Sequence, residues 1–334
     1  MAVTIKDVAK EARVHMSTVS RAFSMPHRLR PETRTRVLEA ARRLGYRPSR
    51  VARALTTGRT HNIGFIVADI ANPFFPPMIK AAEHAARARD YHLFIADASE
   101  DPAIETELVD ALAKQVDGVI LCGPRIANAK IERLSENIPI ALVNRKINGI
   151  PSVTMDVVHG AETAIAHLLE LGHRKLAYVA GPRQSWTNSR ISRTVSTAAE
   201  GRASVTVLGP NTPNENAGLT VAEQIAGSGV TAVLAYNDLL AIGLMEGLHD
   251  LGVDVPGEVS VIGVDDTVLA RLARPRLTTI VVPTADAGTA AVDLLLQYTA
   301  GDEDLSARAA GQVSLPTQLV VRDSTAPPPV ASAP

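Results

Sequence analysis

The sequence predicts an α/β protein with an all-α helix-turn-helix headpiece at its N-terminus and a two-lobed core built on parallel sheets. Three short helical patterns fill residues 1–46, whereas short apolar runs alternate with helix-length stretches through the remainder. Such alternation is typical of a mostly parallel sheet covered by helices. The length of 334 residues also favours more than one domain, at about 150 residues each.

Composition excludes several classes of protein. Hydrophobic residues make up 46% and charged residues 21% of the chain, which is typical of a globular protein and not of a disordered one. No apolar run approaches the roughly 20 residues of a membrane span, and residues 1–10 lack an apolar signal core. We therefore expect a cytoplasmic protein without a membrane partner. The single cysteine, Cys122, rules out a disulfide within the chain.

The near-neutral net charge of −1 hides an asymmetry. Residues 1–61 hold 14 Lys and Arg against 4 Asp and Glu, whereas the remaining residues hold 20 against 31. A small, strongly basic segment is the electrostatic signature of a polyanion-binding surface, although a solvated charged face is the alternative. We expect the acidic remainder to repel DNA, so that the N-terminal segment alone contacts it.

The basic segment is predicted to form three helices. Thr4 is placed as the N-cap of the first, the second spans about 16–23, and the third begins at Pro31 and ends at Gly45. Two short helices joined by a tight turn and backed by a third form a helix-turn-helix unit. Apolar residues recur at helical spacing in all of them: Ile5, Val8, Ala9 and Ala12; Val19, Ala22 and Phe23; Val37, Ala40, Ala41 and Leu44.

The second helix of such a unit enters the major groove by its N-terminal end. Met16, Ser17, Ser20 and Arg21 lie on the side away from its apolar residues. Arg21 can make the bidentate contact to guanine, which is the commonest specific base contact. A phosphate contact or an ordinary surface charge is the alternative for Arg21.

Nine strands are expected in the remainder, at 62–68, 91–96, 118–122, 139–143, 175–180, 204–208, 231–235, 259–264 and 277–282. Ligands of parallel α/β folds bind beyond the carboxyl ends of the strands. The residues at those ends combine amides, carboxylates and aromatic rings, the mixture that a polyol needs: Asp69, Asn72, Phe74, Phe75, Cys122, Asn144, Arg145, Asn237, Asp238, Asp265 and Asp266. The alternative is that they cap helices or form turns, which we favour for Asp238 and Asp266.

Signatures of catalysis are missing from the sequence. It contains no glycine-rich phosphate loop, no Gly-x-Ser-x-Gly nucleophile elbow and no paired-histidine metal motif. We therefore expect no catalytic residue, no metal and no cofactor.

Several segments together resemble the lactose-repressor/galactose-repressor family of transcription regulators. They are "TIKDVAKEARVHMSTVSRAFS", "PETRTRVLEAARRLGYRPSRVARALTTGRTHNIGFI", "ANPFF", "DGVIL", "LVNR", "LLELGHRKLAYVAGP", "AVLAYNDLLAIG", "VPGEVSVIGVDD" and "LTTIVVP", in order over nearly the whole chain. The resemblance implies a DNA-binding headpiece, a hinge helix, and an effector core like that of periplasmic sugar-binding proteins.

The resemblance also assigns DNA-contacting positions. Met16, Ser17 and Arg21 match base-reading positions, and Thr18 and Ser20 match helix positions near the DNA backbone. Leu55 matches a residue that wedges between base steps in the minor groove. The candidate DNA contacts are therefore Thr4, Met16, Ser17, Thr18, Ser20, Arg21 and Leu55.

Effector contacts follow in the same way, since Asn72, Asn144, Asn237 and Asp265 match effector-contacting positions of the family. Ile191 stands where the family carries its pocket arginine, and Arg190 is the candidate replacement through a one-residue shift. The candidate effector contacts are Asn72, Phe74, Phe75, Asn144, Arg145, Arg190, Asn237 and Asp265, with Trp186 and Asn188 at the pocket mouth.

Two residues of the headpiece depart from the family pattern. Arg13 stands where relatives have Gly, which costs about 1–2 kcal/mol if the backbone keeps a positive φ. His15 stands where relatives have a Ser N-cap, and the weaker cap costs about 1 kcal/mol.

The expected organisation is a headpiece at 1–46, a hinge helix and linker at 47–60, an effector-binding and dimerisation core at 61–323 and a disordered tail at 324–334. Three crossovers are expected between the lobes, near 156–158, 283–286 and 311–315. We expect a homodimer, with a tetramer left open, that binds double-stranded operator DNA as a repressor and is released by a small sugar-like effector. The alternative is a corepressor-dependent regulator that senses a purine or another metabolite.

Overall fold

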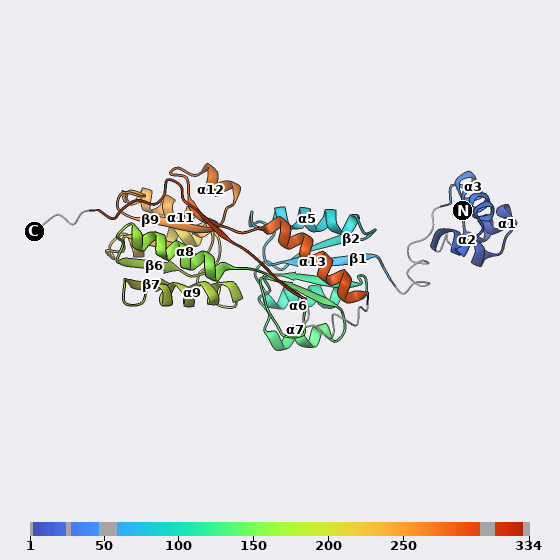
Figure 1. Ribbon diagram of the computed structural model, residues 1–334, viewed down its shortest axis with the longest axis horizontal. Coiled ribbons are helices and arrows are strands. Elements are labelled where there is room, and N and C mark those ends of the chain that lie inside the picture. Colours follow the sequence, from blue (N-terminus) through green and yellow to red (C-terminus); the bar gives the residue numbers. More distant parts are fainter. Residues whose placement is uncertain (1–2, 25–27, 47–58, 301–310, 330–334) are drawn as a thin grey trace, which may run out of the picture. The chain divides into compact units, whose positions relative to one another are not determined.

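The computed structural model describes residues 3–24, 28–46, 59–300 and 311–329. The chain divides into two compact units, Met1–His61 and Asn62–Pro334 (Figure 1). The first unit is the helix-turn-helix headpiece that the sequence predicts, and the second is the α/β core.

Three helices form the headpiece: α1 (Ile5–Ala12), α2 (Met16–Ser24) and α3 (Pro31–Leu44). Their apolar stripes converge on one small core, as the helical spacing predicts. Pro31 occupies the first turn of α3 and Gly45 ends it at φ +66°, because a left-handed C-cap favours glycine. The buried core consists of Val8, Ala9, Ala12, Val19, Ala22, Val37, Ala40 and Ala41.

The turn between α1 and α2 keeps the geometry that the family pattern implies. Arg13 adopts φ +51°, and its N–H donates to the carbonyls of Ala9 and Lys10. A non-glycine residue therefore bears the left-handed strain, at about 1–2 kcal/mol. His15 caps α2 weakly, since its Nδ1 accepts from the backbone N–H of Ser17 at 3.3 Å.

The core contains two sheets of six strands each among the described residues. The first has the order β11-β5-β4-β3-β1-β2 and the second β12-β10-β9-β8-β6-β7, and all pairs are parallel except β10 with β12. The strands of the first sheet are β1 (Asn62–Val67), β2 (His92–Asp97), β3 (Gly118–Cys122), β4 (Ile140–Val143), β5 (Ser152–Met155) and β11 (Gln312–Leu315). Those of the second are β6 (Lys175–Val179), β7 (Ser204–Leu208), β8 (Ala232–Ala235), β9 (Ser260–Asp265), β10 (Thr278–Val281) and β12 (Gln318–Val320).

Each of the nine predicted strands is present within a residue or two of its expected bounds. The sequence reading missed β5, β11 and β12. These strands are only three or four residues long, and each begins with a polar residue: Ser152, Gln312 and Gln318. Pairing with a neighbouring strand, and not a run of apolar residues, defines them.

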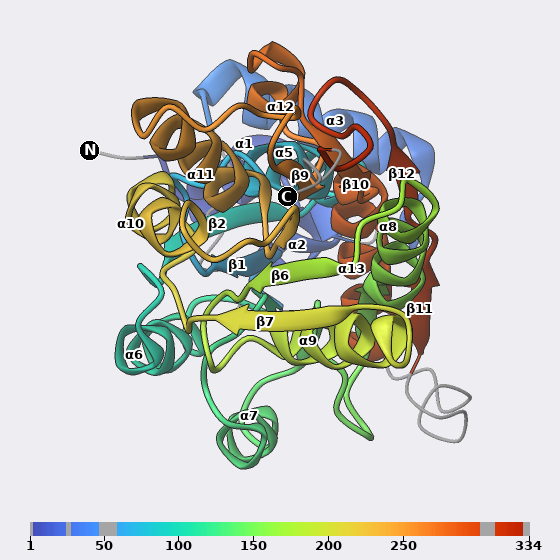
Figure 2. The ribbon, with the colours of Figure 1, turned by 90° about the vertical axis from the view of Figure 1, so that its left-hand side faces the viewer.

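Helices cover both faces of each sheet. In the first lobe α5 (Phe75–Arg87) and α13 (Thr284–Thr299) pack on one face, and α6 (Pro102–Leu112) and α7 (Asn128–Ser135) on the other. In the second lobe α8 (Val157–Glu170) and α9 (Trp186–Ala199) lie opposite α10 (Glu215–Ile225) and α11 (Asp238–Asp250), and α12 (Val268–Leu272) is short. Figure 2 looks onto this lobe, with α10 and α11 on the left and α8 on the right.

Side chains that alternate along a strand contribute to the hydrophobic cores on both faces of the sheet. Ile63, Phe65 and Val67 face the core beneath α5, whereas Ile66 faces the core beneath α6 and α7. Successive side chains of a strand point to opposite faces, so a continuous apolar run is what a sheet covered on both sides requires.

Three segments connect the lobes. The chain crosses at Asp156 between β5 and α8, and again at residues 282–283 between β10 and α13, close to where the sequence predicts. The third crossing, expected near 311–315, follows directly at residues 316–317, because Gln312–Leu315 form β11 in register with β5. Thr317 Oγ1 donates to the carbonyl of Asp156 at 2.7 Å and so ties the third connection to the first.

The predicted disordered tail is wrong over residues 324–329. Ser324 is fully buried, its hydroxyl donates to the carbonyl of Val261 at 2.6 Å, and it accepts from the N–H of Thr278 at 2.8 Å. The carbonyl of Ala326 accepts from the Ser260 hydroxyl at 3.0 Å. These contacts attach the segment to the second lobe, although its composition resembles a linker. Residues 330–334 lie outside the described part of the chain.

Candidate functional site

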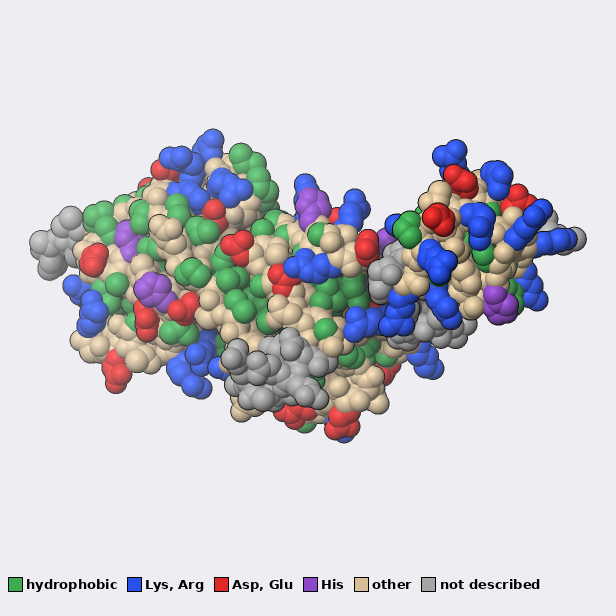
Figure 3. All heavy atoms as spheres, turned by 45° about the vertical axis from the view of Figure 1, so that its right-hand side comes forward, with side chains coloured by type: hydrophobic (Ala, Val, Ile, Leu, Met, Phe, Trp, Pro, Cys, Tyr) green, Lys and Arg blue, Asp and Glu red, His purple; other side chains and the backbone are tan. Residues whose placement is uncertain are grey.

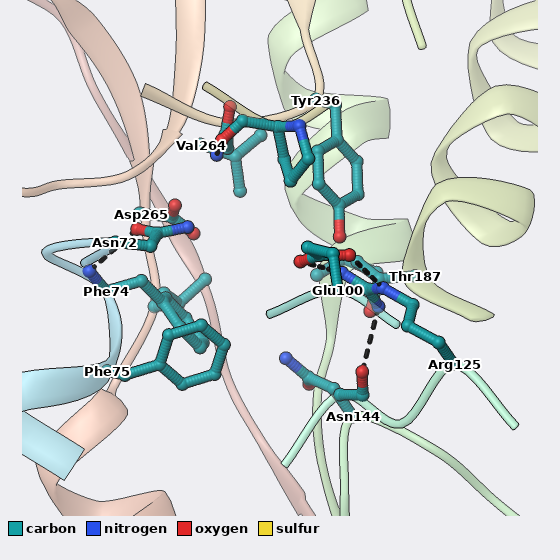
Figure 4. Close-up of a pocket in the computed structure, with 15 residues that line it drawn as sticks. Asn72, Phe74, Phe75, Glu100, Arg125, Asn144, Thr187, Tyr236, Val264 and Asp265 are labelled. Atoms are coloured by element: carbon teal, nitrogen blue, oxygen red, sulfur yellow. Dashed lines mark hydrogen bonds and ion pairs between the residues drawn. The ribbon is translucent and has the colours of Figure 1, made fainter. Parts of the chain in front are cut away.

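A pocket lies between the two lobes, at the carboxyl ends of their strands (Figure 4). The empty space inside it, including its open mouth, is about 570 Å³. Side chains from both sheets converge there because parallel strands end at one edge. The lining residues are Asn72, Phe74, Phe75, Glu100, Gly123, Arg125, Asn144, Val157, Thr187, Pro213, Tyr236, Asn237, Val264, Asp265 and Val282.

Six predicted effector residues are among these lining residues: Asn72, Phe74, Phe75, Asn144, Asn237 and Asp265. Their chain positions agree with the rule that placed them. Asn144 directly follows β4, Asn237 follows β8, and Asp265 is the last residue of β9.

The first lobe contributes an aromatic corner. Phe74 and Phe75 meet edge to face, with ring centroids 4.9 Å apart and planes at 89°. Asn72 Oδ1 accepts from the N–H of Phe74 at 3.0 Å, which leaves the amide nitrogen of Asn72 available to a ligand (Figure 4). An apolar face beside an amide suits a sugar ring, which has C–H groups on one side and hydroxyls at its edge.

An arginine from the first lobe also lines the pocket. Arg125 Nε donates to Glu100 Oε2 at 2.5 Å and Arg125 Nη2 donates to Glu100 Oε1 at 2.8 Å, a bidentate ion pair. Nη1 donates to the carbonyl of Gly123 at 2.9 Å. Burial opposes the charge of Arg125, but Tyr236 and Glu100 outweigh that effect and raise its pKa, so the guanidinium is charged.

Asp265 presents a carboxyl group to the pocket from the second lobe. Its backbone has φ +122°, and within the described part of the chain its side chain has no hydrogen-bond partner. Burial, followed by repulsion from Asp238, raises the pKa of Asp265 well above its usual value. Asp265 is half-buried at the pocket wall, and a ligand hydroxyl could donate to its carboxyl group.

The neighbouring carboxylates, Asp238 and Asp266, have structural partners, which agrees with the structural role favoured for them from the sequence. Asp238 Oδ1 accepts from the Thr279 hydroxyl at 2.6 Å, and Oδ2 accepts from the N–H of Thr267 at 2.7 Å. Asp266 pairs with Arg271 and Arg322. Neither Asp238 nor Asp266 lines the pocket.

Arg145 and Arg190 lie outside this pocket, contrary to the prediction. The guanidinium of Arg145 donates all its N–H groups to Asn128 Oδ1 and to the carbonyls of Pro124, Ile126 and Gln184, so none remains for a ligand. This arginine fastens loops of the two lobes together.

Arg190 is exposed on α9 and lies 5.4 Å from the ring centroid of Trp186, in a separate pocket lined also by Lys146 and Gln312. The next residue, Ile191, is fully buried in the core of the second lobe. The one-residue shift fails because successive helical residues point about 100° apart. Asn188 is not at the pocket mouth, since its Oδ1 accepts from Tyr178 and Gly181.

Sequence reasoning missed four polar pocket residues: Glu100, Arg125, Thr187 and Tyr236. Glu100 follows β2, and Arg125 follows β3 by three residues, so the strand-end rule that selected Asn144 could have found both. Tyr236 directly precedes Asn237. The hydroxyls of Tyr236 and Ser185 lie 3.0 Å apart.

The headpiece exposes the predicted base-reading side chains. Met16, Ser17 and Arg21 of α2 are exposed, and Thr18 and Ser20 are half-buried. Figure 3 shows Lys and Arg side chains spread over the visible face of this unit, at the right of the view. Thr4 is exposed, and its N–H and hydroxyl both donate to Asp7. Leu55 lies outside the described residues.

Neither a membrane span nor a metal cluster is found among the described residues. No helix there is long and apolar enough to cross a membrane. The same residues contain no cluster of three or more His, Cys, Asp or Glu side chains that could hold a metal ion.

A basic helix-turn-helix unit joined to a two-lobed core, with a pocket of polar and aromatic side chains between the lobes, defines a class of regulators that couple DNA binding to a small molecule. Residues 4–49 match the family described as bacterial regulatory proteins, lacI family, and residues 165–325 match the periplasmic binding protein-like domain.

Curated relatives match along nearly the whole chain. Catabolite control protein A of Priestia megaterium is 33% identical over 97% of this chain and 100% of the relative. The regulator GalS of Salmonella typhimurium is 32% identical over 91% of this chain and 92% of the relative.

Solved structures agree in fold. The lac repressor dimer bound to operator and the anti-inducer ONPF has a TM-score of 0.84 and 25% identity, covering 98% of this chain and all of that chain. The regulator CelR in complex with cellobiose has a TM-score of 0.70 and 27% identity, and the match covers 96% of this chain and 99% of the CelR chain. The chain belongs to the LacI family and is a DNA-binding transcriptional regulator.

Proposed function

We propose that this protein is a homodimeric repressor that leaves its operator when a small polyhydroxylated ligand binds between the lobes of its core. The observation that carries the proposal is the pocket itself, which both lobes line with amides, a carboxyl group and an aromatic pair. A ligand that contacts both lobes fixes their relative rotation, and β1 of the core begins one residue after the N-terminal unit ends.

A dimer follows from the headpiece. One helix-turn-helix covers a half-site, so a palindromic operator needs two. Exposed apolar side chains on β2 and α12 supply a candidate dimer surface: Phe94, Ile95, Leu269 and Leu272. In the dimer we assign base reading to Met16, Ser17 and Arg21 and the minor-groove wedge to Leu55.

Relatives support the ligand class. The solved structure of CelR contains cellobiose, and that of a regulator from Enterococcus faecium contains ribose. We assign ligand contacts in this chain to Asn72, Phe74, Phe75, Asn144, Asn237 and Asp265, and we add Arg125, Glu100 and Tyr236. Because its partner is DNA, we place the protein in the cytoplasm and assign it regulation, not catalysis.

The test begins with an operator selected from random DNA by the full-length protein. Its affinity is then measured by fluorescence anisotropy with and without ribose, glucose, galactose, cellobiose, lactose, adenine and guanine. We expect a neutral sugar to weaken DNA binding of the wild type. Asp265→Ala should lose that response and keep the DNA affinity of the ligand-free protein.

Asp110→Ala, an exposed change on α6, is the matched control and should respond like the wild type. If Asp265→Ala responds normally, the pocket is misplaced. Tighter DNA binding with adenine or guanine would replace induction with corepression, and no response to any compound would contradict a sensing role for the core.

A further inference from the structure

We propose that the pocket selects neutral polyhydroxylated ligands and excludes their phosphorylated forms, because Glu100 neutralises the pocket arginine, Arg125. This inference rests on the proposed function and adds the charge of the ligand to it. Glu100 is thereby a specificity-determining residue, although the sequence alone did not draw attention to it.

The ion pair with Glu100 engages the guanidinium of Arg125. Arg125 and Glu100 share two parallel hydrogen bonds, and their side chains are only 7% and 18% exposed. A bidentate pair at this depth is screened little by water or salt. Arg125 can therefore offer a ligand only an N–H group that Glu100, Gly123 and Tyr236 leave free, and not an unbalanced positive charge.

The side chains that line the pocket carry no net positive charge. Among the described lining residues the charged or acidic side chains are Arg125, Glu100 and Asp265. Asp265 adds one negative charge when ionised and none when protonated. The net charge of the lining is thus zero or −1, which disfavours an anionic ligand.

Three titratable groups behind the lining add no positive charge to it, since Asp238 next to Asp265 is either neutral or negative. Arg145 donates all its N–H groups to protein oxygens. Glu105 Oε2 accepts from the N–H of Arg125 at 2.8 Å and from that of Ile126 at 3.2 Å. Arg145 and Glu105 are both fixed by the protein, and their opposite charges offset one another.

A phosphate would have to break the pair. It carries about −1.5 to −2 charges at pH 7 and would compete with Glu100 for the Arg125 fork. The displaced carboxylate would stay close to the phosphate without its partner, and removing one partner of a buried pair is strongly unfavourable. Sugar hydroxyls avoid this cost, because they can donate to Asp265 and accept from the spare N–H groups of Arg125, Asn72 and Asn144.

The backbone holds Glu100 in this position. Its φ is +61°, its N–H donates to the carbonyl of Ala68 at 2.6 Å, and the next residue, Asp101, caps α6. The carboxylate therefore starts from a fixed turn, which limits its retreat before an incoming anion.

Isothermal titration with three probe sets tests the proposal on the full-length protein: glucose with glucose 6-phosphate, ribose with ribose 5-phosphate, and inorganic phosphate alone. We expect the wild type to bind the neutral member of a pair at least tenfold more tightly and not to bind inorganic phosphate. Glu100→Gln frees the charge of Arg125, so it should acquire phosphate binding and shift the ratio at least tenfold towards the phosphorylated sugar.

Two controls identify the source of the gain. Adding Arg125→Gln to Glu100→Gln should remove the new phosphate binding, and Glu107→Gln, an exposed change on α6, should behave like the wild type. Urea unfolding of each variant checks that the fold is kept. If Glu100→Gln does not fold, the wild-type measurements decide by themselves.

Three results would overturn the inference: wild-type binding of inorganic phosphate that Arg125→Gln abolishes, tighter wild-type binding of a phosphorylated sugar, or no gain in folded Glu100→Gln. The proposed function fails in a different way, when no compound changes DNA binding. The inorganic phosphate measurement needs no knowledge of the sugar, so it reports on the ion pair in either case.

Discussion

Asp238 is a single residue whose burial makes the stability of the core depend on pH. Desolvation is the largest effect and raises its pKa from 3.8 to about 7. Between these values the unfolded state releases the proton while the folded state retains it. The stabilisation is therefore complete below about pH 4 and is lost as pH rises through 7.

We predict that the free energy of unfolding of the core falls between pH 4 and 7 and that Asp238→Asn makes this slope shallower. The slope of one such group is at most about 1.4 kcal/mol per pH unit. Urea unfolding at a series of pH values measures it. Asp250→Asn, an exposed change at the end of α11, should keep the wild-type slope. An unchanged slope in Asp238→Asn would assign the titration to another group.

Arg21 lies on the exposed side of α2 and has no ion-pair partner among the described residues. Arg21→Ala should weaken operator binding by about 1–3 kcal/mol and relax the preference at one base position. Competition binding with single-base operator variants measures both effects. Arg42→Ala, in the last turn of α3, is the control with the same loss of charge. An equal loss on every DNA sequence would show that Arg21 contacts a phosphate.

At the scale of elements, α1 and α3 end in the same left-handed cap with different residues. Arg13 has φ +51° and Gly45 has φ +66°, and nothing lies within 4 Å of the position that a Cβ on Gly45 would take. Backbone conformation alone therefore sets the effect of a side chain at Gly45. Both positions are exposed, so packing contributes little to either exchange.

Opposite substitutions should have opposite effects on these caps. Arg13→Gly should stabilise the headpiece by about 0.5–1 kcal/mol, because relief of strain exceeds the added entropy of the unfolded chain. Gly45→Ala should destabilise it by about 1 kcal/mol. Thermal unfolding of the headpiece transition in the full-length protein measures both, with Arg13→Lys as a neutral control. A lower midpoint for Arg13→Gly would mean that its side chain stabilises the turn.

At the scale of the whole molecule, ligand and DNA must affect one another equally. If the ligand weakens operator binding by some factor, the operator weakens ligand binding by the same factor, typically about 5–150-fold. Titration of the active sugar into the free protein and into the protein–operator complex measures the second factor. Unequal factors would show that ligand and DNA compete through a further binding event, such as a change in oligomeric state.

The sequence by itself determined the class of the protein. Helical spacing around Val8, Val19 and Val37 located the headpiece, because a helix buries one face. Apolar runs located nine strands, because a strand in a sheet covered by helices on both sides buries both faces. Knowing where strands end selected eleven residues, six of which line the pocket, since parallel strands bring their carboxyl ends to one edge.

Only the tertiary structure decided which charged side chains reach the pocket. Arg145 and Arg125 stand near the ends of neighbouring strands. Arg145 donates its N–H groups to Asn128 and to loop carbonyls, whereas Arg125 pairs with Glu100, 25 residues away. The short strands β5, β11 and β12 and the attached segment 324–329 were equally beyond the sequence pattern. The partners are other strands, loops and side chains, most of them distant in the chain, and hydrogen bonds to such groups leave no periodic trace in the sequence.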